Sequence, residues 1–444
     1  MLEHILADDT QSIAAENQPV FSLDFDFDGE QQKHAAAVEK WKRLEDDERA
    51  AYSNKIDSFI KANDVRDLRD PALIPAKNWS IVQREIEARV RDQNVLELLP
   101  VSELHFEQAL LEIVENIENV EHVRDLYKLR KRTTGSTKNA GISAGEATRI
   151  KNCLRQGREL YLSGKSGSLM VKPLNFFYSL TAYAYGIIIL NSPIRYSLDN
   201  LPGSHGLNYL PTDAKAQFGG DMPRGTFSDL FTSFPTFTIK NKNLEIIQDN
   251  SDSLFHFYKN RFTTSTGTLL SMVPEIREYY KLVTGQQSRT YPLEVSLGRA
   301  HRSVVWEFQI GDGEVRPSLS DVQKAFDGFA INERFGKIVV DIPASSAHKM
   351  KASIYTDAKG GFWYIENPFF PLILPEECVH FILTNAFSNI MRYSPDNWGS
   401  ILFNEGNSEV SLITRKYLSA FENKFPLLAL RSISRFYPYV STAN

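Results

Sequence analysis

Apolar residues recur at spacings of three and four along several stretches of the chain, and this period predicts amphipathic helices. The clearest stretch runs from Phe106 to Val123, and Ser102 is placed to cap its first turn. Further helices are expected over residues 143–165, 374–398 and 411–436. Helical segments are therefore expected both before and after the middle of the chain.

The middle of the chain changes to a period of two, which is typical of half-buried strands. Alternating apolar residues fill 291–315, another strand is expected over 336–343, and 349–368 predicts a hairpin that turns at DAKGG. Residues 191–234 differ, because they contain many Gly and Pro residues and show little periodicity. Loops of this length inside a compact domain are often functional.

These patterns together predict an α+β fold that is predominantly helical, in which a β-rich middle insertion interrupts a helical core. Five segments are expected along the chain. They are an acidic N-terminal segment (1–30), a helical N-terminal region (31–147), the first part of the helical core (148–290), the β-rich segment (291–370) and the C-terminal helices that complete the core (371–444).

The first 30 residues contain eight acidic side chains and no Lys or Arg. Within them, the piece FSLDFDFDGE alternates apolar and acidic residues. Such a piece is typical of a solvated tail or an edge strand. It also fits a short interaction segment that docks on a basic surface, either on a partner or on its own chain.

The most apolar stretch, SLMVKPLNFFYSLTAYAYGIIIL, runs from Ser168 to Leu190. Its uninterrupted part, Phe176 to Leu190, has 15 residues, whereas a membrane-spanning helix needs roughly 18 or more apolar residues. Pro173 suits the first turn of a helix. We therefore expect a buried core helix, packed by its aromatic residues against the C-terminal HFILTNAFSNIM helix, and no membrane segment.

The composition narrows the class of protein. A net charge of −5 over 444 residues indicates no overall preference for nucleic acid, and leaves room only for a local basic patch. Two cysteines, Cys153 and Cys378, exclude a disulfide framework and a Cys-rich zinc site. The start MLEHILADDTQ lacks the features of a signal peptide, so a reducing cytoplasm is the expected compartment.

Several familiar catalytic motifs are absent from the sequence. There is no H-E-x-x-H, G-x-G-x-x-G or Walker A, and the loop TTGSTK lacks the spacing of a phosphate-binding loop. None of the nine histidines forms a metal-ligand pair at helical spacing. Zinc hydrolase, Rossmann and P-loop interpretations are weakened together, and neither a metal nor a cofactor is expected.

One histidine is the candidate catalytic residue. His205 lies between Gly203 and Gly206 in the long loop, where an exposed imidazole is able to donate or accept a proton. The alternative is a turn histidine that pins the loop by hydrogen bonds to the backbone.

Cationic side chains near the apolar stretch are candidates for binding a phosphate or a carboxylate. Arg155 and Arg158 lie three apart on one helix face, and Lys172 follows just beyond. The alternative is that they pair with Glu159 or with the preceding acidic helices. Arg392, near the end of the apolar C-terminal helix, is a further candidate, with capping of that helix or local pairing as its alternative.

A run of basic residues ends the helix predicted from Phe106 onward. Such a run complements the negative end of the helix dipole. It also predicts a contact with the phosphates of a nucleic acid. The candidates for this contact are Lys128, Arg130, Lys131 and Arg132.

The residues also carry a family resemblance. CLRQGRELYLSGKSGSLMVKPLNFFYSLTAYAYGIIIL, followed by HGL, resembles the N-terminal signature of the YaaC-like family of bacterial proteins. PEECVHFILTNAFSNIMRYSPDNWGSIL and FENKFPLLAL resemble its closing helices. The resemblance runs from about residue 148 to 435, is interrupted in the β-rich middle, and leaves 1–147 as an addition. Where the family usually has LLLYYG, this chain has Asn175 followed by FFYS.

The helical part of this family resembles HEPN-type domains, many of which are metal-independent RNases built on an Arg and a His in the pattern R-x4–6-H. This chain has no such motif, because Arg195 precedes His205 by ten residues and Arg392 is followed by Asn397 rather than by a His. The resemblance also implies a place in a bacterial defence operon, beside an ATPase or a nuclease.

Three functions are compatible with these observations. The first is a non-enzymatic subunit of a bacterial assembly, such as an anti-phage defence system, that contacts an ATPase or nuclease encoded nearby. The second is an RNase or other nucleic-acid-processing enzyme that uses His205 with Arg158, Arg195 or Arg392. The third is a nucleotide or small-molecule sensor with Arg158, Lys172 and His205 around a pocket. The aromatic-rich cores, the acidic N-terminal segment and the missing catalytic motifs favour the first function, that of a non-enzymatic subunit. A homo-oligomer is also possible from the sequence.

Overall fold

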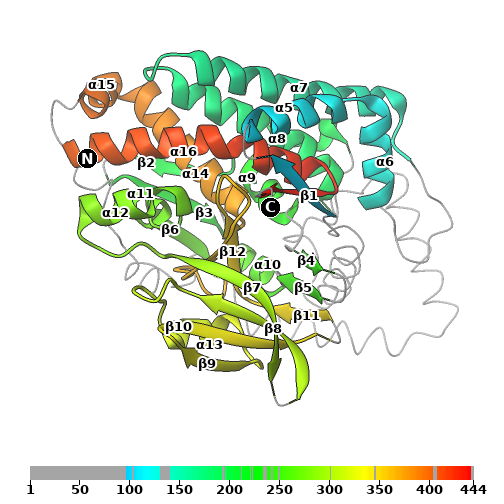
Figure 1. The fold of residues 1–444 in the computed structure, drawn as a ribbon. Coiled ribbons are helices and arrows are strands. Elements are labelled where there is room, and N and C mark those ends of the chain that lie inside the picture. Colours follow the sequence, from blue (N-terminus) through cyan, green and yellow to red (C-terminus); the bar gives the residue numbers. More distant parts are fainter. Residues whose placement is uncertain are drawn as a thin grey trace, which may run out of the picture.

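The structure is a computed structural model that describes residues 97–441 apart from internal gaps. The gaps are 103–104, 131–140, 193–194, 196, 212, 221, 223, 234–237, 242–243, 249–250, 301, 345–346 and 404–407. The acidic segment and most of the predicted N-terminal helical region therefore lie outside the described residues. Figure 1 shows the long helices gathered in one part of the protein and a β-rich part beside them, so the fold is α+β.

The helices come from both halves of the chain. The first half provides α5 (Phe106–Ile117), α6 (Val120–Arg130), α7 (Ala144–Ser166), α8 (Lys172–Asn191) and the turn η3 (Leu198–Asn200). The last part provides α14 (Glu376–Tyr393), α15 (Pro395–Phe403) and α16 (Ser408–Ile433). Shorter helices lie between them: α9 (Thr226–Ser233), α10 (Ser251–Lys259), α11 (Thr266–Leu270), η4 (Pro274–Ile276), α12 (Arg277–Thr284) and α13 (Leu319–Ala325).

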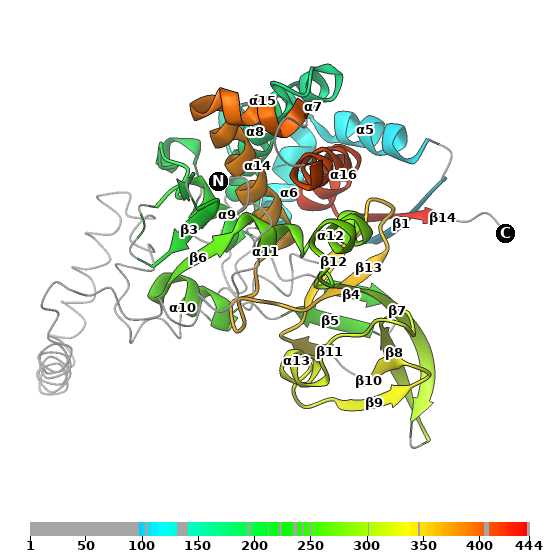
Figure 2. The same ribbon diagram turned by 90° about the vertical axis from the view of Figure 1, so that its left-hand side faces the viewer.

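The strands form four sheets in the described part of the chain. The largest has the order β12-β13-β7-β8-β10-β9, and α13 packs against its apolar face (Figure 2). Its strands are β7 (Thr290–Ala300), β8 (Ser303–Ile310), β9 (Ala330–Arg334), β10 (Lys337–Pro343), β12 (Ser353–Thr356) and β13 (Phe362–Ile365). The smaller sheets are β11-β5-β4 (Ala347–Met350, Leu244–Gln248, Thr238–Asn241), β2-β3-β6 (Asn208–Leu210, Lys215–Gly219, Arg261–Ser265) and β1-β14 (Glu97–Ser102, Phe436–Ser441).

Apolar and polar side chains alternate along the strands of the large sheet, and the apolar face that results forms a second hydrophobic core. Leu293, Phe308 and Val340 point to one face of the sheet and are buried together with Val322 of α13. The opposite face carries charged pairs, such as Arg334 with Glu307 at 3.1 Å. One apolar and one polar face is the expected pattern for an antiparallel sheet covered on a single side.

The predicted single helix from Phe106 to Val123 is wrong, because it is two helices. The first ends at Ile117, and Asn119 begins the next by accepting a hydrogen bond from the backbone N–H of His122 at 2.7 Å. Ser102 belongs to β1 and is not the cap. The uninterrupted apolar spacing gave no sign of this break, because residues on both helices face the same core.

The passage 191–234 is also more ordered than its composition predicts. It contains β2, β3 and α9, and every residue of α9 is buried. Arg195 at the start of the passage forms an ion pair with Asp229 of α9 at 3.0 Å, and both side chains are largely buried. The Gly and Pro residues therefore join short elements rather than forming one loop.

The apolar helix α8 lies in the centre of the helical core, as predicted. Phe177 packs edge-on against Phe381 of α14, with ring centroids 5.4 Å apart, which confirms the predicted contact with the C-terminal helix. By length and composition α8 could cross a membrane, yet most of it is buried inside the protein. Core helices of soluble proteins share these properties, so α8 gives only weak evidence for a membrane segment.

Glycines let α7 approach α8 closely. A Cβ atom on Gly157 would lie 2.3 Å from the ring of Tyr183, and one on Gly186 would lie 2.6 Å from Leu154. The hydroxyl of Ser179 donates to the carbonyl oxygen of Gly157 at 2.6 Å. The two helices are therefore joined by backbone contact as well as by side chains.

Candidate functional site

The loop that carries His205 is fixed by its own backbone. The N–H of Thr226 donates to the carbonyl of Ser204, and that of Phe227 donates to the carbonyl of His205, both at 2.9 Å. Gly206 has a φ of +69°, and a Cβ atom on Gly225 would lie 2.1 Å from the Gly206 nitrogen. The HGL piece therefore has its glycine where the backbone turns and passes another backbone segment without room for a side chain.

The imidazole of His205 lies half-buried against α8. Its ring meets the ring of Phe177 at a centroid distance of 4.9 Å in an edge-on arrangement. Burial and the nearby positive charge of Arg392 lower the pKa of His205 below its usual value, so the ring is neutral at pH 7. Its Nδ1 atom is buried and has no hydrogen-bond partner in the described protein.

Arg392 lies at the end of α14 between two tyrosines. Its guanidinium donates to the hydroxyl of Tyr178 at 3.1 Å and to that of Tyr393 at 2.8 Å, and it lies 4.6 Å from the centre of the Tyr393 ring. Tyr178 is 37% exposed and Tyr393 is 69% exposed. We call Tyr178, Arg392 and Tyr393 the Arg392 surface, with His205 at its inner edge.

Arg158 has a different environment. It is largely buried and pairs with Glu118 at 3.1 Å, with Glu115 at 3.5 Å and with Glu159 at 3.4 Å. The alternative of ion pairing with Glu159 and the preceding acidic helices is therefore what the structure shows for this residue. Arg155, three residues earlier, lies exposed on α7.

Lys172 is likewise engaged within the protein. Its Nζ atom lies 2.7 Å from a carboxylate oxygen of Glu422 on α16 and 3.2 Å from the carbonyl oxygen of Lys165. The structure therefore does not bring Arg158, Lys172 and His205 around one pocket. Of the arginines considered beside His205, Arg392 is the one whose charge acts on it.

The structure contradicts the predicted phosphate contact at one of the four basic residues, Arg130. Arg130 is only 2% exposed and donates to the carbonyl oxygens of Ser432 and Ser434, both at 2.6 Å, and to the side-chain oxygen of Asn191. Burial lowers the pKa of its guanidinium to about 9. This side chain has no surface left for a phosphate, whereas Lys128 is exposed. Lys131 and Arg132 lie outside the described residues.

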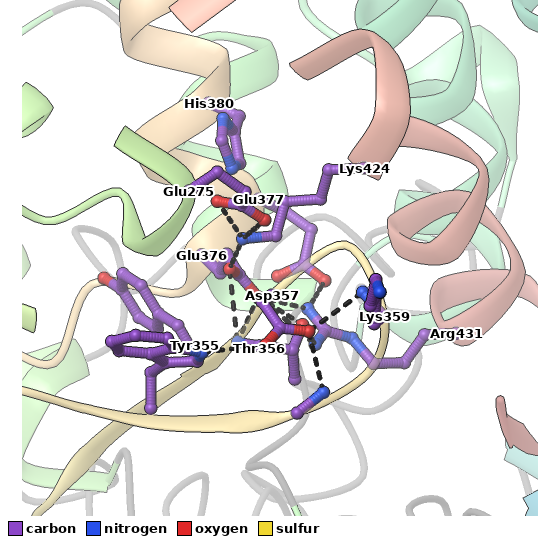
Figure 3. Close-up of polar contacts among 12 residues, drawn as sticks. Glu275, Tyr355, Thr356, Asp357, Lys359, Glu376, Glu377, His380, Lys424 and Arg431 are labelled. Carbon is purple, nitrogen blue, oxygen red and sulfur yellow. Dashed lines mark hydrogen bonds and ion pairs between the residues drawn. The ribbon is translucent and has the colours of Figure 1, made fainter. Parts of the chain in front are cut away.

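A cluster of buried charges joins the helical core to the β-rich part (Figure 3). Lys424 of α16 is fully buried and lies 2.9 Å from Glu275 and 2.5 Å from Glu376. Arg431, two turns further along α16, pairs with Glu376 at 3.2 Å and with Glu377. We call these five residues the buried charge cluster.

The cluster reaches β12 through hydrogen bonds. The carboxylate of Glu376 accepts from the backbone N–H of Thr356 at 3.3 Å and from its hydroxyl at 3.2 Å. His380, one turn along α14, is held neutral, because burial and the charges of Lys424 and Arg431 push its pKa well below the usual value. The cluster therefore fixes the edge of the large sheet to α14 and α16.

Sequence reasoning missed this cluster, although one signal was present. Lys424 and Arg431 lie seven residues apart, on one face of a helix whose intervening residues are mostly apolar. Charges on the buried face of a helix require partners. The Glu376–Glu377 pair, at the start of another apolar helix, was the matching signal.

The ionisation of Glu275 makes stability depend on pH. Burial raises the pKa of its carboxyl from 4.5 to about 7, against the opposing effect of Lys424. Because the folded protein holds this proton more tightly than the unfolded chain, the contribution of Glu275 is complete below about pH 4.5 and is lost as the pH rises through about 7. Between about pH 5 and pH 8, we expect the unfolding free energy of the wild type to fall by about 1–3 kcal/mol relative to that of Glu275→Gln, which has no carboxyl to titrate at this position.

The measurement is urea unfolding of both proteins across this pH range. Glu278→Gln is the matched control, since Glu278 is 76% exposed on the adjacent helix. Its curve should run parallel to that of the wild type. A constant difference between wild type and Glu275→Gln would show that Glu275 does not titrate in this range.

No group of three or more His, Cys, Asp or Glu side chains in the described part is arranged to hold a metal ion. Cys378 is buried, and Cys153 is partly exposed on α7. Near α8, the groups that the structure brings together at the surface are the Arg392 surface and the neutral imidazole behind it.

Comparison with known proteins identifies one relationship. The sequence model of the family described as YaaC-like Protein matches residues 115–433. No curated protein and no solved structure matches this chain. The match begins earlier than the expected residue 148 and includes the end of α5 and all of α6, which Arg130 joins to the last turn of α16 and the residues beyond it.

Proposed function

This chain belongs to the YaaC-like protein family, and from that premise we propose that it is a non-enzymatic subunit of a bacterial multi-protein assembly. In this proposal the protein works in the cytoplasm in anti-phage defence and binds an ATPase or a nuclease encoded nearby. The support comes from the chemistry of its surface, because the family description names no activity.

The observation that carries the proposal is the Arg392 surface. Tyrosine and arginine are enriched at the centres of protein–protein interfaces, where they contribute most of the binding energy. Here two tyrosine hydroxyls hold the guanidinium in one position, at 3.1 and 2.8 Å. A side chain that is already fixed loses little entropy on binding, so this surface is prepared for contact with a partner.

Three of the other candidate cations support the same interpretation. Arg158, Lys172 and Arg195 are each satisfied by carboxylates inside the protein, whereas Arg155 lies exposed on α7. They stabilise the fold and present no charge to a substrate. Arg392 differs from these three, because it contacts neutral hydroxyls and an aromatic ring at the surface.

A second function is favoured by one observation. His205 is neutral and lies near the guanidinium of Arg392, which is the pair of residue types that a metal-independent RNase uses for proton transfer and phosphate binding. Here the two residues come from different elements rather than from one R-x4–6-H motif. This function remains the alternative, and an RNA-cleavage assay of the isolated chain separates the two.

The test is co-expression of the full chain with the ATPase or nuclease encoded beside its gene, followed by size-exclusion chromatography and affinity measurement. Tyr393→Ala is expected to weaken the complex by about tenfold or more, because it removes an exposed aromatic anchor and the ring beneath Arg392. Phe335→Ala is the matched control, since Phe335 is a fully exposed aromatic residue on the β-rich part. It should leave the affinity unchanged.

Two outcomes would contradict the proposal. One is the absence of any complex with these neighbours at micromolar concentrations. The other is cleavage of RNA by the isolated chain that is lost in His205→Ala while the fold, followed by circular dichroism, is kept. The second result would establish the RNase alternative.

A further inference from the structure

A cleft of about 470 Å³ opens beside α6, on a different part of the helical core from the Arg392 surface. One wall is α6, and the other is the turn from α16 into β14. Ile117, Leu129 and Phe436 give it an apolar and partly aromatic lining. Its volume is within the range of sites that bind small molecules.

Two cations at this cleft have no carboxylate partner among the described residues. Lys128 comes from α6 and Arg435 from the turn between α16 and β14, and both are exposed. No ion pair joins either of them to another residue in the described part of the chain. In contrast, the buried cations Arg158, Lys172 and Lys424 all have carboxylate partners. The cleft therefore offers positive charge that no carboxylate in the described part of the protein neutralises.

Neutral polar groups complete the lining. The Nε2 atom of His122 lies 2.9 Å from the carbonyl oxygen of Ile433, and a carbonyl only accepts, so Nε2 carries the proton. Burial and the charge of Arg130 lower the pKa of His122 below its usual value, which leaves Nδ1 as a hydrogen-bond acceptor at pH 7. Asp125, one turn along α6, adds a carboxylate.

We propose that this cleft binds a nucleotide. Lys128 and Arg435 hold the phosphate, since two cations converging on an apolar cleft favour a compact anion. Phe436 and Leu129 cover the face of the base, because aromatic rings stack on any of the bases. Asp125 and Nδ1 of His122 accept hydrogen bonds from the hydroxyls of the sugar or the amino groups of the base.

Such a ligand would bridge segments that are far apart in the sequence. His122 and Ile433 are 311 residues apart, and the cleft lies directly beside the contacts that join them. The unfolded chain has no such two-walled cleft, so the ligand binds only the folded protein. Binding therefore raises the melting temperature of the whole protein. This inference does not depend on the proposed partner.

The test is equilibrium binding of ADP, GDP, AMP and inorganic phosphate to the full chain by calorimetry, with melting temperatures measured in parallel. We expect saturable binding of at least one nucleotide, weakened about tenfold or more by Lys128→Ala and by Arg435→Ala. Arg124→Ala is the matched control, because Arg124 is an exposed cation on α6 that does not line the cleft. It should change the affinity by less than about twofold.

Three results would overturn the proposal. They are the absence of binding by every nucleotide, binding that neither Lys128→Ala nor Arg435→Ala weakens, and binding of inorganic phosphate as tight as that of the nucleotides. A single-stranded RNA that binds through Lys128 and Arg435 when no mononucleotide does would also overturn it, and would assign this surface to nucleic acid.

Discussion

Replacing Lys424 by alanine is expected to lower the free energy of unfolding by about 3–5 kcal/mol, because it leaves carboxylates buried without their cation. The lysine is fully buried and lies within 2.9 Å of both Glu275 and Glu376. Removing one partner of a buried ion pair costs much more than the pair contributes to stability, since the remaining charge has neither water nor a partner. Urea unfolding of the two proteins measures the difference.

Lys416→Ala is the control for this change. Lys416 lies on the same helix and rests on the ring of Tyr279 at 4.5 Å, but it is partly exposed and has no carboxylate partner in the described part. It should cost about 1 kcal/mol or less. The double variant Lys424→Met with Glu275→Leu should regain part of the lost stability, because both members of one pair are then apolar. A loss below about 1 kcal/mol in Lys424→Ala would contradict the burial of these charges.

Replacing Gly157 by valine is expected to cost about 3 kcal/mol, at the upper end for adding atoms to a packed core. Its Cβ atom would lie 2.3 Å from the Tyr183 ring and 3.0 Å from the carbonyl oxygen of Ser179. The ring is fully buried and packs on Phe425 of α16 at a centroid distance of 5.2 Å, so it has no space to move into. Helices α7 and α8 would have to separate.

Thermal and urea unfolding of Gly157→Val measure this effect, and Gly145→Ala is its control. Gly145 lies on the same helix, and a Cβ atom there would meet nothing within 4 Å. That change should be neutral or should stabilise the helix by up to about 1 kcal/mol. An equal effect of the two substitutions would show that helix propensity, rather than the contact with α8, determines the result.

The sequence was most informative where a periodic pattern determines the structure. The apolar run from Phe176 to Leu190 has no polar face, and a helix of that kind must lie inside the protein. The alternation of apolar residues within 291–310 likewise predicted the strands β7 and β8. In both cases the information is local, because the period of the side chains sets the structure of the segment.

The candidate site depended on contacts that no local pattern contains. Arg158, Lys172 and Arg392 were all candidates from the sequence, yet of these three only Arg392 lies near His205. What separates them is the position of carboxylates 40 and 250 residues away, at Glu118 and Glu422. Such pairings follow from the packing of whole helices, so a single sequence does not reveal them.

The contact between Arg130 and the carbonyl oxygens of Ser432 and Ser434 also has a consequence for synthesis on the ribosome. The residues it joins are 302 and 304 positions apart, and the strand pair β1–β14 spans a similar separation. While the chain is being translated, the guanidinium of α6 can reach Asn191, but its two backbone acceptors do not yet exist. Helix α6 packs on α7 and α8, which follow it closely, whereas α5 packs on α16. The apolar face of α5 that meets α16 must therefore stay uncovered until the α16 segment has left the ribosome, and apolar surface exposed in this way favours aggregation.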